Sequence, residues 1–211
     1  MKIQILMDNP NSWMVPYAKQ LQGELLKKGH TVLFHSSAES VSAGDILLLL
    51  SCEKIFRDLH LNTHNLVVHA SALPQGKGMS PTTWQILEGK NIIPLTLFEA
   101  TAKVDSGTIY AISSIQLNGT ELIEEIREKE GYAINVLIHD FVNSYPNLKG
   151  YEPVGDESFY RRRTPENSEL DINKTISEQF NLLRVVDNER YPAFFRLNEQ
   201  KYILKIEKAD E

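Results

Sequence analysis

The sequence predicts an α/β fold in which a doubly wound, mostly parallel sheet is followed by a small helix-plus-hairpin appendage. Two observations favour this class. Short apolar runs alternate with segments of helical periodicity through most of the chain. Two of these runs, "DILLLL" at 45–50 and "NLVVH" at 65–69, have the apolar character of central strands in a parallel sheet.

The elements of the main sheet region follow in order from these patterns. The expected strands are runs rich in apolar or β-branched residues, at 2–6, 31–35, 45–50, 65–69, 93–100 and 107–115. The expected helices carry apolar residues at helical spacing and lie between 13 and 29, between Ser80 and Gly89, and from about Thr120 to Phe141. Pro81 marks the first turn of the second helix, and a capping-box pattern opens the third at Thr120. These elements predict a Rossmann-like domain over residues 1–150.

The character of the chain changes after "NSYPNLKG" at 143–150. The stretch 151–171 is rich in charge and turn formers, so we expect a linker that crosses the surface. A helix at about 174–186 and a hairpin of "AFFRL" and "KYILKI" around Asn198 and Glu199 are expected to close the chain. Residues 151–211 are therefore interpreted as a linker and a small C-terminal subdomain.

Composition excludes several functional classes. The formal net charge of −6 argues against a protein held to nucleic acid by phosphate neutralisation. Cys52 is the single cysteine, which favours a buried structural thiol, and no metal site is predicted. The N-terminus lacks the apolar core of a secretory signal, and the longest apolar run, 46–50, is too short to span a membrane. The expected compartment is the cytoplasm, with no membrane partner.

A histidine ends the run "VVH" and is followed by the loop "ASALPQGKGMSPTTW". Ligands of open α/β sheets bind at the carboxyl ends of strands, which favours a functional role for His69. The alternative is a core histidine that bonds to a loop carbonyl. Asp105, 36 residues later in the loop "KVDSG", offers a carboxylate that would stabilise the protonated imidazole. Its alternative role is that of a turn residue.

The stretch from His69 to Tyr110 resembles the catalytic core of the 10-formyltetrahydrofolate-dependent formyltransferases. This family includes the methionyl-tRNA, glycinamide ribonucleotide and nucleotide-sugar formyltransferases. The segments that carry the resemblance are "HASALPQGKG", "SPTTWQILEGK", "PLTLFEATAKVDSGTIY", "RRRTPENSELDINKT" and "NLLRVVDNERYPAFF". It implies that residues 1–150 form the catalytic domain and that 10-formyltetrahydrofolate is the co-substrate.

The resemblance implies formyl transfer to a primary amine, with His69 as the proton carrier and Asp105 as its partner. The family's asparagine, two residues before the histidine, is replaced here by Val67. Asn65 is roughly 13 Å from His69 along a strand, at about 3.3 Å per residue, and cannot replace it. Four stabilisers of the oxyanion stay open: the backbone N–H groups of 76–78, Lys77, Gln75, and His69 once protonated.

The resemblance also implies residues for binding. It places the pterin between residues 51–56 and 91–97, which makes the expected folate-binding residues Ser51, Cys52, Glu53, Lys54, Leu73, Pro74 and Pro94. For the acceptor we expect polar residues, an aromatic ring and a point charge for a diphosphate: Asn9, Asn11, Trp13 and Lys77. The alternative roles are helix capping for Asn9 and Asn11, core packing for Trp13, and a structural turn for Leu73 and Pro74. The run 161–163 could bind a phosphate or form a solvated surface. We favour the solvated surface, with one arginine paired to Glu166 or Asp171.

The acceptor is expected to be a small molecule. The acidic balance disfavours tRNA, and the segment "RRRTPENSELD" resembles the sugar and tRNA branches of the family. A nucleotide-linked amino sugar for surface polysaccharide therefore remains. Glycinamide ribonucleotide, methionyl-tRNA, a carrier-bound aminoacyl group, and a non-catalytic folate- or sugar-nucleotide-binding module are the alternatives, and a homodimer is left open.

Overall fold

The computed structural model describes residues 1–209, and its centre is a six-stranded sheet in the order β2-β1-β3-β4-β6-β7. The strands are β1 (Lys2–Leu6), β2 (Thr31–His35), β3 (Gly44–Leu49), β4 (Asn62–His69), β6 (Ile92–Glu99) and β7 (Ile109–Gln116). The first four are parallel, whereas β6 pairs antiparallel with both β4 and β7. The expected class, a mostly parallel doubly wound sheet, is confirmed.

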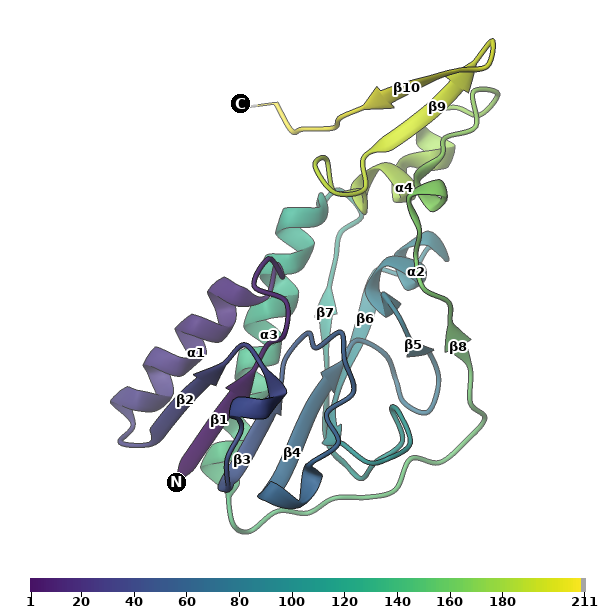
Figure 1. Ribbon diagram of the computed structural model, residues 1–211. Helices are drawn as coiled ribbons and strands as arrows, with labels where there is room; N and C mark the ends of the chain where they lie inside the picture. The colour runs from purple at the N-terminus through teal and green to yellow at the C-terminus, as the bar shows by residue number, and fades with distance from the viewer. Residues whose placement is uncertain (210–211) are drawn as a thin grey trace.

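Two long helices cover one face of this sheet. They are α1 (Val15–Lys27) and α3 (Ile123–Ser144), which pack on each other and on the apolar side chains of the strands (Figure 1). Each helix is amphipathic, so burying its apolar stripe against the sheet removes that surface from water and holds the layer in place. The main core lies between the helices and the sheet.

The other face is covered by connections instead of long helices. A smaller cluster of Leu6, Val41, Leu47 and Phe56 lies under the links that join β2 to β3 and β3 to β4. These links contain only the short 3₁₀ turns Ala38–Ser40 and Leu59–Leu61. β2 lies on one side of β1 in the sheet, and β3 lies on the other side. The direction in which strands are added therefore reverses between β1 and β3.

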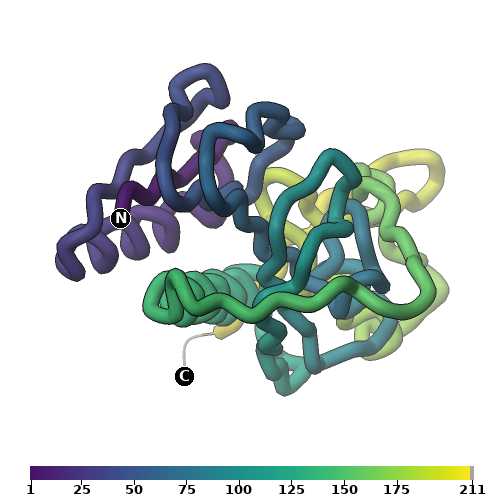
Figure 2. Tube along the Cα trace, turned by 90° about the horizontal axis from the view of Figure 1, so that it is seen from below, coloured from purple at the N-terminus to yellow at the C-terminus, as the bar shows by residue number. Residues whose placement is uncertain are grey.

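The segment after α3 returns along the outside of the molecule. Figure 2 shows it crossing from the end of α3 to the opposite side. There β8 (Phe159–Tyr160) pairs in parallel with β5 (Lys77–Gly78), just before α2 (Pro81–Leu87). This pairing fixes the loop that follows β4, because β5 belongs to that loop.

The C-terminal part lies at the carboxyl end of the parallel strands (Figure 1). It contains α4 (Phe180–Arg184) and the antiparallel pair β9 (Ala193–Leu197) and β10 (Gln200–Leu204). Asn198 and Glu199 both have positive φ, 49° and 67°, which matches the expected two-residue hairpin turn. None of the helices within residues 1–209 is long and apolar enough to cross a membrane.

Two expected helices have different limits from those predicted. The long helix begins at Ile123, not at Thr120, and the N–H of Leu122 donates to the Glu125 carboxylate. Thr120 instead belongs to a turn closed by the Asn118 side chain. The helix expected at 174–186 is reduced to a 3₁₀ turn at Ser177–Gln179 and the short α4, because the Gln179 amide bonds back to the Asp171 backbone and closes a compact turn.

Candidate active site

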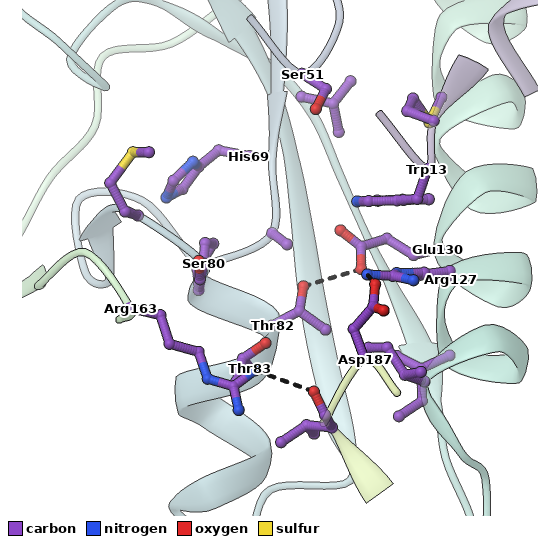
Figure 3. Close-up of a pocket in the computed structure, with 18 of the residues that line it drawn as sticks. Trp13, Ser51, His69, Ser80, Thr82, Thr83, Arg127, Glu130, Arg163 and Asp187 are labelled. Atoms are coloured by element: carbon purple, nitrogen blue, oxygen red, sulfur yellow. Dashed lines mark hydrogen bonds and ion pairs between the residues drawn. The ribbon is translucent and has the colours of Figure 1, made fainter. Parts of the chain in front are cut away.

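A cavity of about 400 Å³ opens at the carboxyl ends of β1, β3 and β4. It lies where the strand order reverses, which is the position at which open α/β sheets bind their ligands. Its walls come from the loop after β1, the loop after β3, the end of β4, the start of α2, the buried face of α3, and the segments 162–163 and 185–191 (Figure 3). Residues far apart in the sequence therefore meet at a single site.

His69 is the last residue of β4 and lies at the wall of this cavity. Its Nε2 is 2.9 Å from the carbonyl oxygen of Gly76. A carbonyl oxygen can only accept, so Nε2 carries the hydrogen in this arrangement and Nδ1 is left to accept a proton. The structure thus contains the carbonyl contact of the core-histidine alternative, and within residues 1–209 it leaves Nδ1 without a hydrogen bond.

Asp105 faces that free nitrogen. Its Oδ1 is 3.9 Å from His69 Nδ1, an ion-pair distance once the ring is protonated but too long for a hydrogen bond. The other oxygen, Oδ2, accepts the N–H of Gly78 at 3.0 Å. Asp105 has a φ of 50°, so it also has the turn conformation of the alternative role. The residue therefore forms the turn and places its carboxylate opposite His69. The imidazolium form of His69 would have an acceptor opposite each nitrogen.

The loop 76–78 does not offer free backbone donors. The N–H of Gly76 donates to Ser158 Oγ at 2.8 Å, and that of Lys77 donates to the Ser158 carbonyl at 2.9 Å. The N–H of Gly78 is taken by Asp105. Gly78 must stay glycine, since a Cβ there would be 2.4 Å from the Tyr160 carbonyl oxygen at a φ of +98°.

Lys77 is not at the cavity, contrary to the expectation that it meets a diphosphate. Its side chain is 1% exposed, and Nζ donates to Ser106 Oγ and to Glu157 Oε1, both at 2.8 Å. Together with Lys103, this contact lowers the pKa of Glu157 to about 2. Lys77 therefore links β5 to the loops that contain Ser106 and Glu157. Gln75, another expected oxyanion donor, is exposed.

Val67, at the position of the family's asparagine, packs in an apolar cluster with Leu73, Phe98 and Ile109. Asn65 turns away, because its Nδ2 donates to the Leu59 carbonyl at 2.8 Å. The structure thus agrees with the inference that Asn65 cannot supply the missing amide.

Apart from Lys77, the expected binding residues divide into two groups. Four of them line the cavity: Trp13, Ser51, Cys52 and Glu53. Six others lie outside its walls: Asn9, Asn11, Lys54, Leu73, Pro74 and Pro94. Asn9 donates to Glu53, and Lys54 donates its N–H to Asp8, so both support the loop after β3 without forming the wall.

Cys52 is half-buried and its thiol donates to the Leu6 carbonyl at 3.2 Å. Burial, followed by the nearby Asp8 carboxylate, raises the pKa of the thiol to about 12. A thiol with this pKa stays protonated at neutral pH and is a poor nucleophile. This chemistry favours the structural role expected for the thiol over a nucleophilic one, and the residue also lines the cavity.

Of the three consecutive arginines, Arg161 and Arg162 are exposed as expected, whereas Arg163 is half-buried. Arg161 lies over the Trp84 ring, with 5.3 Å between the guanidinium carbon and the ring centroid. Arg162 and Arg163 both line the cavity. Arg163 donates to the Val185 carbonyl and to Ser168 Oγ. Within residues 1–209 none of them is paired with Glu166 or Asp171.

Sequence reasoning missed the polar group on the far wall of the cavity. Glu130 of α3 accepts a hydrogen bond from Thr82 Oγ1 of α2 at 3.0 Å, and Arg127 bonds to Asp187 at 2.9 Å (Figure 3). The sequence does contain a signal for Glu130. Ile126, Glu130 and Ile134 are spaced by four residues, so a carboxylate interrupts the apolar stripe of the helix.

No protein-family model matches the chain. A bifunctional polymyxin resistance protein, ArnA, from Wigglesworthia glossinidia brevipalpis is 27% identical over 155 residues, which cover 72% of this chain. The match spans 23% of that relative's own length.

Solved structures of formyltransferases share the fold over the whole chain. Methionyl-tRNA formyltransferase from Clostridium thermocellum matches 100% of this chain and 94% of its own, with a TM-score of 0.83 and 19% identity. A sugar N-formyltransferase from Shewanella matches 100% and 99%, with a TM-score of 0.70 and 14% identity. HypX from Aquifex aeolicus, solved with tetrahydrofolic acid, matches 98% of this chain and 37% of its own, with a TM-score of 0.78 and 17% identity. The resemblance read from the sequence is confirmed: the chain has the formyltransferase fold.

Proposed function

We propose that this protein is an N-formyltransferase that moves a formyl group from 10-formyltetrahydrofolate to the primary amine of an amino sugar. One observation carries the proposal. His69 lies at the wall of a cavity at the carboxyl edge of the sheet, with an acceptor facing each ring nitrogen. That arrangement stabilises an imidazolium, which is what a proton carrier needs.

His69 is assigned the proton transfer. As the amine attacks the formyl carbon, the amine nitrogen loses a proton to Nδ1, and the same proton is available for the folate nitrogen that leaves. Asp105, at 3.9 Å, stabilises the imidazolium, and the Gly76 carbonyl holds the ring in place.

Negative charge on the formyl oxygen must be stabilised without the family's asparagine. The backbone N–H groups of 76–78 and the Lys77 ammonium are already bonded within the protein. Of the four expected stabilisers, the protonated His69 therefore has the best support, because its positive charge appears in the same cavity as the developing negative charge. No covalent bond between enzyme and substrate is required.

The residues of the cavity fit a folate co-substrate, which would supply the activated formyl group. Its walls contain both polar and apolar residues, among them Ser51, Glu53 and Val68. We assign the loop 51–53 to folate binding. HypX, which shares the fold, was solved with tetrahydrofolic acid, and this supports the assignment.

For the acceptor we propose a nucleotide-linked amino sugar used in surface polysaccharide. The cavity offers an aromatic ring, Trp13, for a sugar or base, and the guanidinium of Arg162 for a phosphate. The fold shared with a sugar N-formyltransferase supports a sugar amine. The cytoplasmic location expected from the sequence stays a prediction, and a homodimer stays open.

A second candidate function is a folate- or sugar-nucleotide-binding module without turnover. Val67 in its apolar cluster favours it, since the usual stabiliser of the oxyanion is absent. The retained pairing of His69 with Asp105 favours the enzyme, because a module that only binds needs no proton carrier.

The test is release of tetrahydrofolate from 10-formyltetrahydrofolate, followed by absorbance, with nucleotide-linked amino sugars, glycinamide ribonucleotide and methionyl-tRNA as acceptors. Turnover with one amino sugar is expected. His69→Asn should lower kcat by about 10³-fold, within the range for general acid–base catalysis, and leave folate affinity unchanged. His60→Asn, an exposed histidine in a 3₁₀ turn, is the control. Folate binding with no turnover for any acceptor would favour the binding module.

A further inference from the structure

Glu130 is a carboxylate in an otherwise apolar place. It lies on the buried face of α3 between Ile126 and Ile134, and all three residues line the cavity. The residue is 9% exposed. A leucine or methionine would fill this place without the cost of burying a carboxyl group. The fold therefore gives no reason for an acid here.

The carboxyl group is only half bonded. One oxygen, Oε2, accepts from Thr82 Oγ1 at 3.0 Å. Within residues 1–209 no hydrogen bond from the protein reaches the other oxygen, and Figure 3 shows the Glu130 side chain directed between Trp13, Thr82 and Arg127 into the cavity. Buried carboxylate oxygens are normally hydrogen-bonded, so an open one at a cavity points to a ligand.

Among residues 1–209, no charged group forms an ion pair with Glu130. Arg127, on the same helix, is bonded to Asp187 and Glu124, each at 2.9 Å. The other titratable groups on the cavity wall belong to other elements: Cys52, Glu53, His69, Arg162, Arg163 and Tyr191. Thr82 and Thr83 face it from α2 and are neutral. The carboxylate is thus free to pair with a cation from outside.

Burial raises the pKa of Glu130 to about 7, and the Thr82 hydrogen bond and the Arg127 charge lower it only in part. A carboxyl group with this pKa is half ionised at neutral pH and can both accept and release a proton there. Formyl transfer needs the acceptor as a free amine, because an ammonium ion has no lone pair with which to attack. Alkyl amines, however, are mostly ammonium ions at neutral pH.

We infer that Glu130 binds the ammonium group of the acceptor and takes its proton, so that the acceptor reaches His69 as a free amine. This inference rests on the proposed function. Thr82 positions the carboxylate, and the loop 51–53 and Trp13 complete the walls around it.

The protons balance over one turnover. The first proton passes from the ammonium nitrogen to Glu130, which becomes a neutral acid, and leaves to water after the product departs. The second leaves the amine nitrogen as the new C–N bond forms, is carried by His69, and ends on the folate nitrogen whose bond to the formyl carbon breaks. The formyl carbon is neither oxidised nor reduced.

The experiment is a pH profile of kcat/KM for the amino-sugar acceptor that turns over. Glu130→Gln keeps the size of the side chain and an oxygen for Thr82, but it cannot titrate. We expect kcat/KM at pH 7 to fall by about 10²-fold, the lower range for loss of a general base, with folate affinity unchanged. The rise in kcat/KM with pH around 7 should disappear, so that remaining activity follows only the free-amine fraction of the acceptor.

Two further variants test whether Glu130 is the group responsible for the rise in kcat/KM. Thr82→Val removes the hydrogen bond that lowers the pKa of Glu130, so the rise in kcat/KM should move to higher pH. Glu128→Gln, an exposed position on the same helix, should leave the profile unchanged. Melting temperatures show whether each variant is folded.

The outcomes separate the two proposals. Turnover by the wild-type protein with the same profile in Glu130→Gln would overturn the inference and leave the formyltransferase in place. No wild-type turnover with any acceptor would overturn the proposed function, and this inference with it. Loss of the rise in Glu130→Gln together with its upward shift in Thr82→Val supports both.

Discussion

At the scale of single residues, Asp105 combines two tasks that a substitution can separate. Its backbone occupies the left-handed region at a φ of 50°, which asparagine tolerates nearly as well as aspartate. Its Oδ2 accepts the N–H of Gly78, a bond that an asparagine oxygen can keep. Only the negative charge opposite His69 Nδ1 is specific to the acid.

Asp105→Asn is therefore expected to leave the fold intact and to damage catalysis. The free energy of unfolding should change by less than about 0.5 kcal/mol, as for substitutions that keep local contacts. The value of kcat should fall by about 10²-fold, because the imidazolium of His69 loses its counter-charge. Urea unfolding and tetrahydrofolate release measure the two effects, with the exposed Asp58→Asn as control. An unchanged kcat would remove Asp105 from the mechanism.

At the scale of elements, the contact between α1 and α3 depends on one glycine. A Cβ on Gly131 would lie 2.5 Å from the Tyr17 ring of α1, so the two helices can approach only without it. Gly23, in the middle of α1, has no heavy atom within 4 Å of the place of a Cβ and no positive φ. The same substitution should therefore act in opposite directions at the two sites.

Gly131→Ala is expected to lower the free energy of unfolding by about 1–3 kcal/mol, the usual cost of overpacking. Gly23→Ala should raise it by up to about 1 kcal/mol, the difference in helix propensity between the two residues. The urea midpoints of unfolding of both variants, compared with that of the wild type, measure these two changes in stability. Because α3 carries Glu130 to the cavity, Gly131→Ala should also raise KM for the acceptor. A Gly23→Ala variant that is less stable than the wild type would contradict the packing described.

At the scale of the whole molecule, two buried glutamates make stability depend on pH in opposite ways. Burial alone would raise the pKa of Glu121, but the Lys129 ammonium and backbone N–H groups from Asn118 onward lower it to about 2. Arg184, fully buried, also bonds to Glu121 and links α4 to the main sheet region. Glu130, with a pKa of about 7, has the reverse shift.

The sign follows from proton binding by the two states. Glu121 stabilises the fold above its ordinary pKa of 4.5, and this is lost as the pH falls toward 2, by up to about 3 kcal/mol at about 1.4 kcal/mol per pKa unit. Glu130 binds its proton more tightly in the folded state, so its stabilising effect is complete below pH 4.5 and is lost as the pH rises toward 7.

Urea unfolding between pH 2.5 and 8 should therefore show a stability maximum in the mildly acid range. Glu121→Gln should reduce stability at pH 7 by about 3 kcal/mol, as for a buried pair that loses one partner, and flatten the acid side. Glu130→Gln should flatten the side toward neutral pH. Identical pH curves for wild type and both variants would show that neither carboxyl has the shift described here.

Sequence patterns alone predict the α/β class, the strands of the main sheet, and the pair His69 and Asp105. These follow from local patterns: apolar runs at strand spacing, glycine and proline at element ends, and a histidine at the end of a buried strand. The division into residues 1–150 and 151–211 stays a prediction, although Arg184 joins the two parts closely.

The set of residues that share the cavity depends on how distant elements pack together. Lys77 was expected there and is enclosed by Ser106 and Glu157, whereas Arg163 was expected in solvent and lines the wall. Glu130 joins Trp13 across more than a hundred residues of sequence because α1 and α3 pack on the same face of the sheet. A local pattern shows what a segment can form, but the direction in which a polar side chain points depends on which distant element packs against it.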